Sequence, residues 1–174
     1  MKQQPEILWD KGSAYDLFTS LYILHRPEEY GLRPSWAAGV RSRLPIHLRD
    51  ALERTQRVVY VPLAWLHALP EPKDAATVME ALKALSPEER LPALVFADKT
   101  DQQKVEQKNY LLSLNGKQRL TAQIERQITS YLPNQFRVTK EYLRTVFEAW
   151  VDREQFGNDL VLALEAYINN FFGE

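Results

Sequence analysis

The side chains best suited to chemistry are three histidines, and their spacing argues against a metal centre. His25, His47 and His67 are widely separated, and no two stand four positions apart, the spacing that puts two metal ligands on one helical face. The chain has no cysteine, so a thiolate metal site and a cysteine nucleophile are both excluded. An isolated histidine near a helix end is usually a cap or a half-buried polar group. We therefore expect no metal and no cofactor.

Two pairs of adjacent acids, Glu28–Glu29 and Glu88–Glu89, are the next candidates for catalysis. Neighbouring residues on a helix point in different directions, so neither pair converges on one substrate atom. The helix dipole already explains acids at a helix start such as Glu88–Glu89. The six glycines are scattered and form no phosphate-binding loop, and no nucleophile motif is present. These patterns predict a protein that is not an enzyme.

Charge is distributed unevenly, although the net charge is only −1 and the isoelectric point is near 6.3. Residues 33–57 hold six arginines and two acids, whereas residues 141–174 hold seven acids and two arginines. Arg41, Arg43 and Arg49 could contact phosphates on one basic surface. The alternative that we favour is a solvated face that pairs with the acidic last helices, within the chain or across a dimer, because the whole chain has no positive field.

The elements that must position these residues are helices. Apolar residues recur at helical spacing after Ser13, which with Asp16 predicts a capping box. Pro27 and Gly31 should end this first helix, and Val58–Val61 suits a buried extended connector. We expect an all-α fold of eight or nine helices with no significant sheet. Further helices are predicted over 34–44, 46–52, 75–82, from 87 with a kink or restart at Pro92, over 117–132, over 140–150 and from 158.

Polar residues mark where several of these helices begin and end. Asp74, Ser86 and Thr139 are predicted N-caps, with Ser86-Pro87-Glu88-Glu89 the clearest helix start in the chain. Asn158 is expected to open the last helix, and Asn115–Gly116 predicts a left-handed stop. The polar stretch 98–108 is expected to be an exposed helical face or a loop.

Aromatic residues suggest which segments are core and which could meet a partner. Trp36, Trp65 and Trp150 follow the apolar periodicity and are expected in the core. Trp9 lies in an N-terminal arm, residues 1–12, that either packs on its own domain or is exchanged with a partner chain. Phe171 and Phe172 near the end suggest a covering partner, and hence a longer protein. The alternative is a standalone relative, in which Gly173 acts as the C-cap of the last helix. We expect residues 1–174 to form a single helical domain.

Three stretches of the chain resemble a known family. SAYDLFTSLYILHRPEEYGL at 13–32, WAAGVRSRLP at 36–45 and LPEPKDAA at 69–76 are similar to the N-terminal helical region of bacterial ArsR-like regulators. The resemblance is strongest over residues 7–90. It implies transcriptional control by a winged helix-turn-helix that lies C-terminal to this region. The 174 residues contain no such pattern, and the metal-binding cysteines of the arsenic-sensing members are missing.

The expected function is therefore a non-enzymatic regulatory domain that senses a small molecule or sets dimer geometry. The alternative is a helical protein–protein interaction domain with no role in DNA binding. We expect the protein to be a cytoplasmic homodimer with no membrane association. Its effector is of unknown identity, and it should contact DNA only through a winged-helix domain outside this chain. The candidate interaction residues are Trp9, Arg41, Arg43, Phe171 and Phe172.

Overall fold

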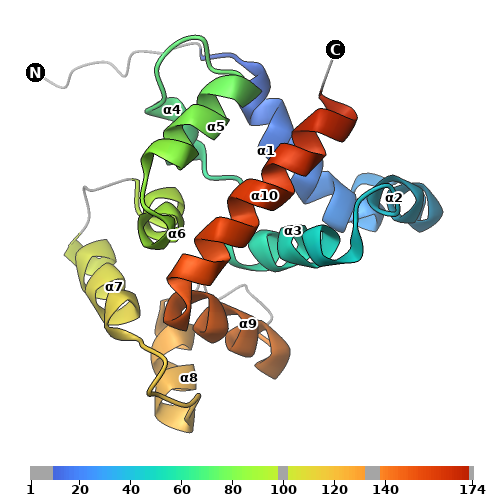
Figure 1. Cartoon of the computed structure of the whole chain (residues 1–174). Helices are drawn as coiled ribbons and strands as arrows, with labels where there is room; N and C mark the ends of the chain where they lie inside the picture. The colour runs from blue at the N-terminus through green and yellow to red at the C-terminus, as the bar shows by residue number, and fades with distance from the viewer. Residues whose placement is uncertain (1–9, 98–101, 132–137, 173–174) are drawn as a thin grey trace, which may run out of the picture.

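A computed structural model describes residues 10–97, 102–131 and 138–172, and in this part of the chain helices are joined by loops (Figure 1). It contains ten α-helices, one 3-10 helix and no strand, so the predicted all-α class is confirmed, with one or two more helices than expected. The elements are α1 Ser13–His25, η1 Pro27–Tyr30, α2 Pro34–Arg41, α3 Ile46–Val58, α4 Leu63–His67, α5 Ala75–Ala84, α6 Pro87–Val95, α7 Gln102–Ser113, α8 Ala122–Ser130, α9 Lys140–Val151 and α10 Arg153–Phe171.

The longest helix, α10, organises the others. It packs against α6, α3 and α5, while α1 packs against α3 and α5 from the N-terminal half of the chain. In Figure 1, α10 crosses the molecule diagonally, and α7, α8 and α9 lie around its N-terminal end. Leu160, Ala163 and Leu164 of α10 are fully buried, as are Leu17, Phe18 and Leu21 of α1. The core thus joins the first and last helices of the chain.

Three predicted N-caps are confirmed. The side chain of Asp74 accepts a hydrogen bond of 2.8 Å from the Thr77 amide, and Thr139 accepts one of 3.1 Å from the Tyr142 amide. Ser86 and Glu89 form the predicted capping box at the start of α6. That helix continues through Pro92 to Val95 without a restart. Local sequence determines these helix starts, because each cap satisfies amides that the helix itself leaves open.

Two other predicted helix starts are wrong. Ser13 is the first residue of α1 and makes no cap; the Ala14 amide instead donates to the Lys73 carbonyl at 3.1 Å, so a distant segment satisfies this helix end. The last helix begins at Arg153 rather than at Asn158, because the Asp152 side chain accepts from the Gln155 amide at 3.3 Å.

The middle of the chain also differs from prediction in two places. The predicted helix over 117–132 is shorter, since α8 begins at Ala122 behind a Thr121 cap. The expected left-handed stop at Gly116 is wrong, because among the described residues Gly31 is the one whose φ lies in the left-handed region, at 69°. Most of the polar stretch that was expected to be a helical face or a loop forms the first part of α7.

The connector after α3 is predicted correctly only in part, since it begins one residue later than expected and Tyr60 and Val61 are half-buried. Val58 is the last residue of α3, and Val59 is extended, with φ −117° and ψ 110°, and fully buried. Pro62 then precedes α4 and is buried as well. Because no strand lies among the described residues, this β-branched segment fills space between helices and is not part of a sheet.

Trp65 and Trp150 lie in the core as expected, but the prediction for Trp36 is wrong. Trp36 is 50% exposed, because α2 is short and turns a single small residue, Ala37, toward the core. No helix in the described part of the chain combines the length and the apolar character needed to cross a bilayer.

Candidate ligand site between α1 and α3

The C-terminal end of α1 places a neutral histidine against α3. The Nδ1 of His25 lies 2.8 Å from the Leu21 carbonyl, and since a carbonyl only accepts, Nδ1 carries the proton. Nε2 is therefore an acceptor; it is buried and has no partner among the described residues. Burial is the main cause that lowers the pKa of His25 below 6.5, with smaller contributions from the positive charges of Arg41 and Arg26. The ring is thus uncharged at neutral pH.

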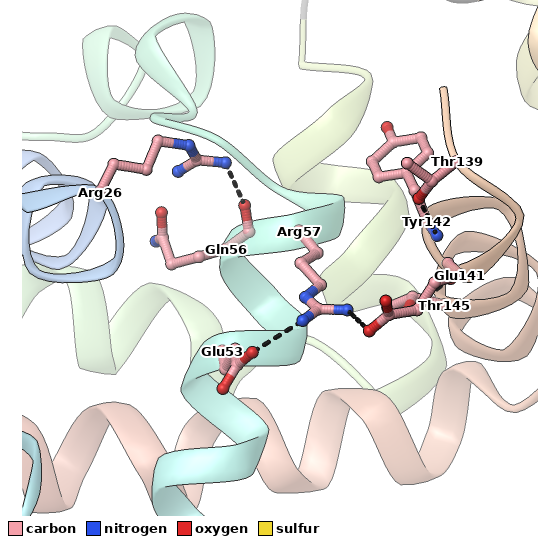
Figure 2. A network of polar contacts seen from close by, with 8 residues as sticks. All are labelled: Arg26, Glu53, Gln56, Arg57, Thr139, Glu141, Tyr142 and Thr145. Atoms are coloured by element: carbon pink, nitrogen blue, oxygen red, sulfur yellow. Dashed lines mark hydrogen bonds and ion pairs between the residues drawn. The ribbon is translucent and has the colours of Figure 1, made fainter. Parts of the chain in front are cut away.

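Arg26, the residue after α1, is held between aromatic rings. Its guanidinium carbon lies 4.2 Å from the ring centroid of Tyr22 and 5.2 Å from that of Tyr60. One terminal nitrogen, Nη2, donates to the backbone carbonyl of Gln56 at 3.4 Å (Figure 2). The other, Nη1, is buried and finds no acceptor in the described part of the chain. Cation–π contacts therefore fix this guanidinium while leaving one of its donor groups free.

Gln56 occupies the buried face of α3 together with Leu52 and Thr55. Only 1% of its surface is exposed, and neither Oε1 nor Nε2 has a partner among the described residues. Thr55 satisfies its own hydroxyl by donating to the Ala51 carbonyl at 2.8 Å. Figure 2 shows the Gln56 side chain extending from α3 toward Arg26. An unsatisfied buried polar group costs about 1–3 kcal/mol, so this amide is an anomaly that needs a cause.

A cleft opens beside these residues at the end of α1. Its volume is about 310 Å³, and its wall includes His25, Arg26 and Pro34. Glu28 and Glu29, both exposed, complete the lining. Two of the four unpartnered atoms, His25 Nε2 and Arg26 Nη1, belong to residues in the wall of this cleft. The other two belong to Gln56, which is outside the wall and is joined to Arg26 through its backbone carbonyl. We name His25, Arg26 and Gln56 together the α1–α3 junction.

The opposite side of α3 carries ion pairs to the last two helices. Arg57 bonds Glu53 at 2.8 Å within α3 and Glu141 at 2.5 Å on α9 (Figure 2), and Arg54 pairs with Asp159 on α10. The contact with Arg57 lowers the pKa of Glu141. For Arg54 and Arg57, the predicted pairing between the arginine cluster and the acidic last helices is confirmed within one chain.

A groove runs along this side of α3, between it and the helices α9 and α10. Three depressions of about 230, 210 and 430 Å³ all include Arg54 in their walls. We call them together the Arg54 groove. Its walls carry two arginines, one histidine and several acids, so the groove is acidic overall. The acids are Asp50, Glu53, Glu148, Asp152 and Asp159.

The candidate residues from the sequence are placed in different regions. The guanidinium carbon of Arg43 lies 5.9 Å from the ring centroid of Phe171. Phe171 and Phe172 are half-buried, with centroids 5.0 and 5.9 Å from the Tyr167 ring. Arg41 is half-buried and acts electrostatically on His25. Trp9 lies outside the described residues. The structure therefore brings Arg43 and Phe171 together and places Arg41 near the α1–α3 junction.

Sequence reasoning missed Arg26 and Gln56. A usable signal for Gln56 was its spacing, because it stands four positions after Leu52 on the face that α3 buries. A polar side chain at a core position of an amphipathic helix is informative, since such groups normally have partners. Arg26 carried no comparable signal, because its aromatic neighbour Tyr60 comes from a segment far along the chain.

The described residues include no group of three or more metal-ligating side chains that could hold an ion. No protein-family model, curated protein or solved structure matches this chain.

Proposed function

We propose that this chain is a non-enzymatic regulatory domain of a bacterial ArsR-like transcriptional regulator, and that it senses a small molecule at the α1–α3 junction. The observation that carries the sensing role is the set of unpartnered buried atoms on His25, Arg26 and Gln56. In native proteins buried polar groups nearly always have partners, so each of these atoms calls for a water, an ion or a ligand as its partner.

The resemblance to ArsR-like regulators supports the same assignment. The stretch 13–32 that carries it includes His25 and Arg26, and Gln56 lies within the wider region 7–90. In this proposal the regulator is a cytoplasmic homodimer, and a winged helix-turn-helix C-terminal to this region reads the DNA. Ligand occupancy would act on the position of α3, whose other side is fixed to α9 and α10 through Arg57 and Arg54.

The coding sequence beyond the codon for Glu174 tests the regulator assignment. A winged helix-turn-helix in the same frame supports it. With that full-length protein, we expect Arg26→Gln to abolish the response of operator binding to the effector, while operator affinity without effector stays unchanged. Turnover of a substrate by the chain, abolished by one conservative substitution of a carboxylate or histidine, would overturn the non-enzymatic assignment.

The Arg54 groove favours a second candidate, a protein–protein interaction domain with no role in DNA binding. Buried Phe147 and Phe156 lie in its wall beside the acids, as in grooves that take an amphipathic helix with basic flanks. A reading frame without a DNA-binding module, together with loss of partner binding on Glu148→Arg, would support this candidate over the regulator.

A further inference from the structure

We propose that the α1–α3 junction binds a free amino acid, a small zwitterion with one carboxylate and one ammonium group. This inference rests on the proposed sensing function and names its ligand class. The chemistry follows from the unpartnered atoms themselves, which include both donors and acceptors.

The donors require an acceptor on the ligand. Arg26 Nη1 and Gln56 Nε2 are both buried N–H donors, and the charge of the guanidinium makes a carboxylate its preferred acceptor. Stacking on Tyr22 and Tyr60 and the bond from Nη2 to the Gln56 carbonyl hold the guanidinium in place before any ligand arrives. Preorganisation of this kind reduces the entropy lost on binding.

The acceptors require a donor on the ligand. His25 Nε2 is an acceptor because Nδ1 holds the ring proton, and Gln56 Oε1 is an acceptor by its chemistry. A simple carboxylate or phosphate would satisfy Arg26 and leave these two atoms unpaired. An ammonium group beside the carboxylate supplies the missing donors.

The charges around the cleft also favour a zwitterion over a dianion. Glu28 and Glu29 line the cleft with Arg26, and the negative charge of Glu53 acts on His25 in opposition to Arg41. A ligand with two negative charges would meet these carboxylates, whereas an ammonium group is attracted to them. The cleft volume of about 310 Å³ leaves room for a side chain as well.

Calorimetric titration of the whole chain with individual amino acids tests the proposal, using two matched analogues of each. The 2-hydroxy acid lacks the ammonium group, and the amino-acid amide lacks the carboxylate. We expect at least one amino acid to bind and both of its analogues to bind about tenfold or more weakly, because each leaves buried partners unsatisfied. Arg26→Gln and Gln56→Leu should abolish binding, whereas Arg119→Gln, a change of an exposed arginine, should leave it intact.

Several outcomes would overturn the proposal. Binding of hydroxy acids or neutral molecules at the junction, with no response to amino acids, would refute the ligand class and leave the sensing function standing. Amino-acid binding that survives Arg26→Gln would place the site elsewhere. Failure of every probe at millimolar concentration, in folded protein with native circular dichroism, would refute both the ligand class and the junction as a sensing site.

Discussion

The backbone of Gly157 in α10 touches the start of α6 at Pro87. A β-carbon at position 157 would lie 2.0 Å from the Pro87 carbonyl oxygen and 2.8 Å from its carbonyl carbon. Buried Arg90 spans the same crossing, since its Nε donates to the Leu82 carbonyl and its Nη1 to the Gly157 carbonyl, both at 2.9 Å. The absence of a side chain at Gly157 therefore sets how closely α6 and α10 pack.

Gly157→Ala should destabilise the protein, because the new methyl group overlaps backbone that cannot rotate away. We expect a loss of about 1–3 kcal/mol or more in the free energy of unfolding, measured by urea denaturation. Gly39→Ala is the matched control, since Gly39 lies in helix α2 with nothing near its β-position. That change should stabilise by up to about 1 kcal/mol. Equal effects at both positions would contradict the close contact.

The bonds made by Asp10 should make the stability of the folded protein depend on pH. Its carboxylate accepts from Tyr15 Oη at 2.6 Å, from His67 Nδ1 at 2.8 Å and from Lys73 Nζ. These bonds, led by the one from Lys73, lower its pKa below 3.8. Because the folded state favours the ionised form, this stabilisation is present above pH 3.8 and is lost as the pH falls through the folded pKa.

Denaturation of Asp10→Asn beside the unmodified chain measures this effect. Asp10→Asn should be less stable at pH 7, and the difference should shrink as the pH falls below 3.8, because the carboxylate of the unfolded chain then takes up a proton while the folded one stays ionised. Lys11→Gln is the control for a neighbouring charge and should show no such convergence. A difference between the Asp10 variant and the unmodified chain that stays constant down to acid pH would contradict the ion pair.

Local sequence predicted the helix starts that depend on local bonds, and not those that depend on distant ones. Ser86 and Glu89 satisfy the first amides of α6 from within four residues, so the pattern alone was enough. Ser13 has the same residue type but no cap, because Lys73 already accepts from the first turn of α1. Trp36 follows the apolar spacing and was therefore expected in the core. The sequence of α2 does not show that only a small part of this helix packs against the core, so the exposure of Trp36 could not be predicted.

The candidate site shows the same division. His25 was visible as an isolated histidine, but its unpartnered Nε2 depends on how α1 packs against α3. Arg54 and Arg57 were correctly expected to pair with the acidic last helices, because opposite charges in two segments predict attraction at any separation in sequence. Which acids they meet, Asp159 and Glu141, is decided by the crossing of α3 with α10 and α9.

Gln56→Leu should raise stability in the absence of ligand. Leucine of similar volume removes two unsatisfied polar atoms from a position that is 1% exposed. We expect a gain of about 1 kcal/mol in the free energy of unfolding. Leu52→Ala, one turn earlier on the same buried face, is the control and should cost about 2–5 kcal/mol. Destabilisation by Gln56→Leu would mean that the amide has partners, and would weaken the sensing assignment.

The chain alone should bind duplex DNA only as a weak polyanion contact. Two of the six arginines in residues 33–57, Arg54 and Arg57, are engaged by acids of α10 and α9, and the net charge is −1. Fluorescence titration of labelled duplex at low and moderate salt checks this, since phosphate contacts weaken as salt rises. Sub-micromolar binding that persists at ~150 mM salt and is lost on combined Arg41→Ala and Arg43→Ala would show a true DNA surface.

Ligand sensing at the α1–α3 junction is tested most directly by the NMR signal of the Gln56 side-chain amide. This signal is assigned by its loss in Gln56→Leu. We expect saturating amounts of an amino acid that binds in calorimetry to shift this amide strongly, because its Nε2 and Oε1 gain partners. The exposed amide of Gln118 should not move. A Gln56 amide that stays in place while the amino acid is bound, or that moves equally in Arg26→Gln, would contradict ligand sensing at the α1–α3 junction.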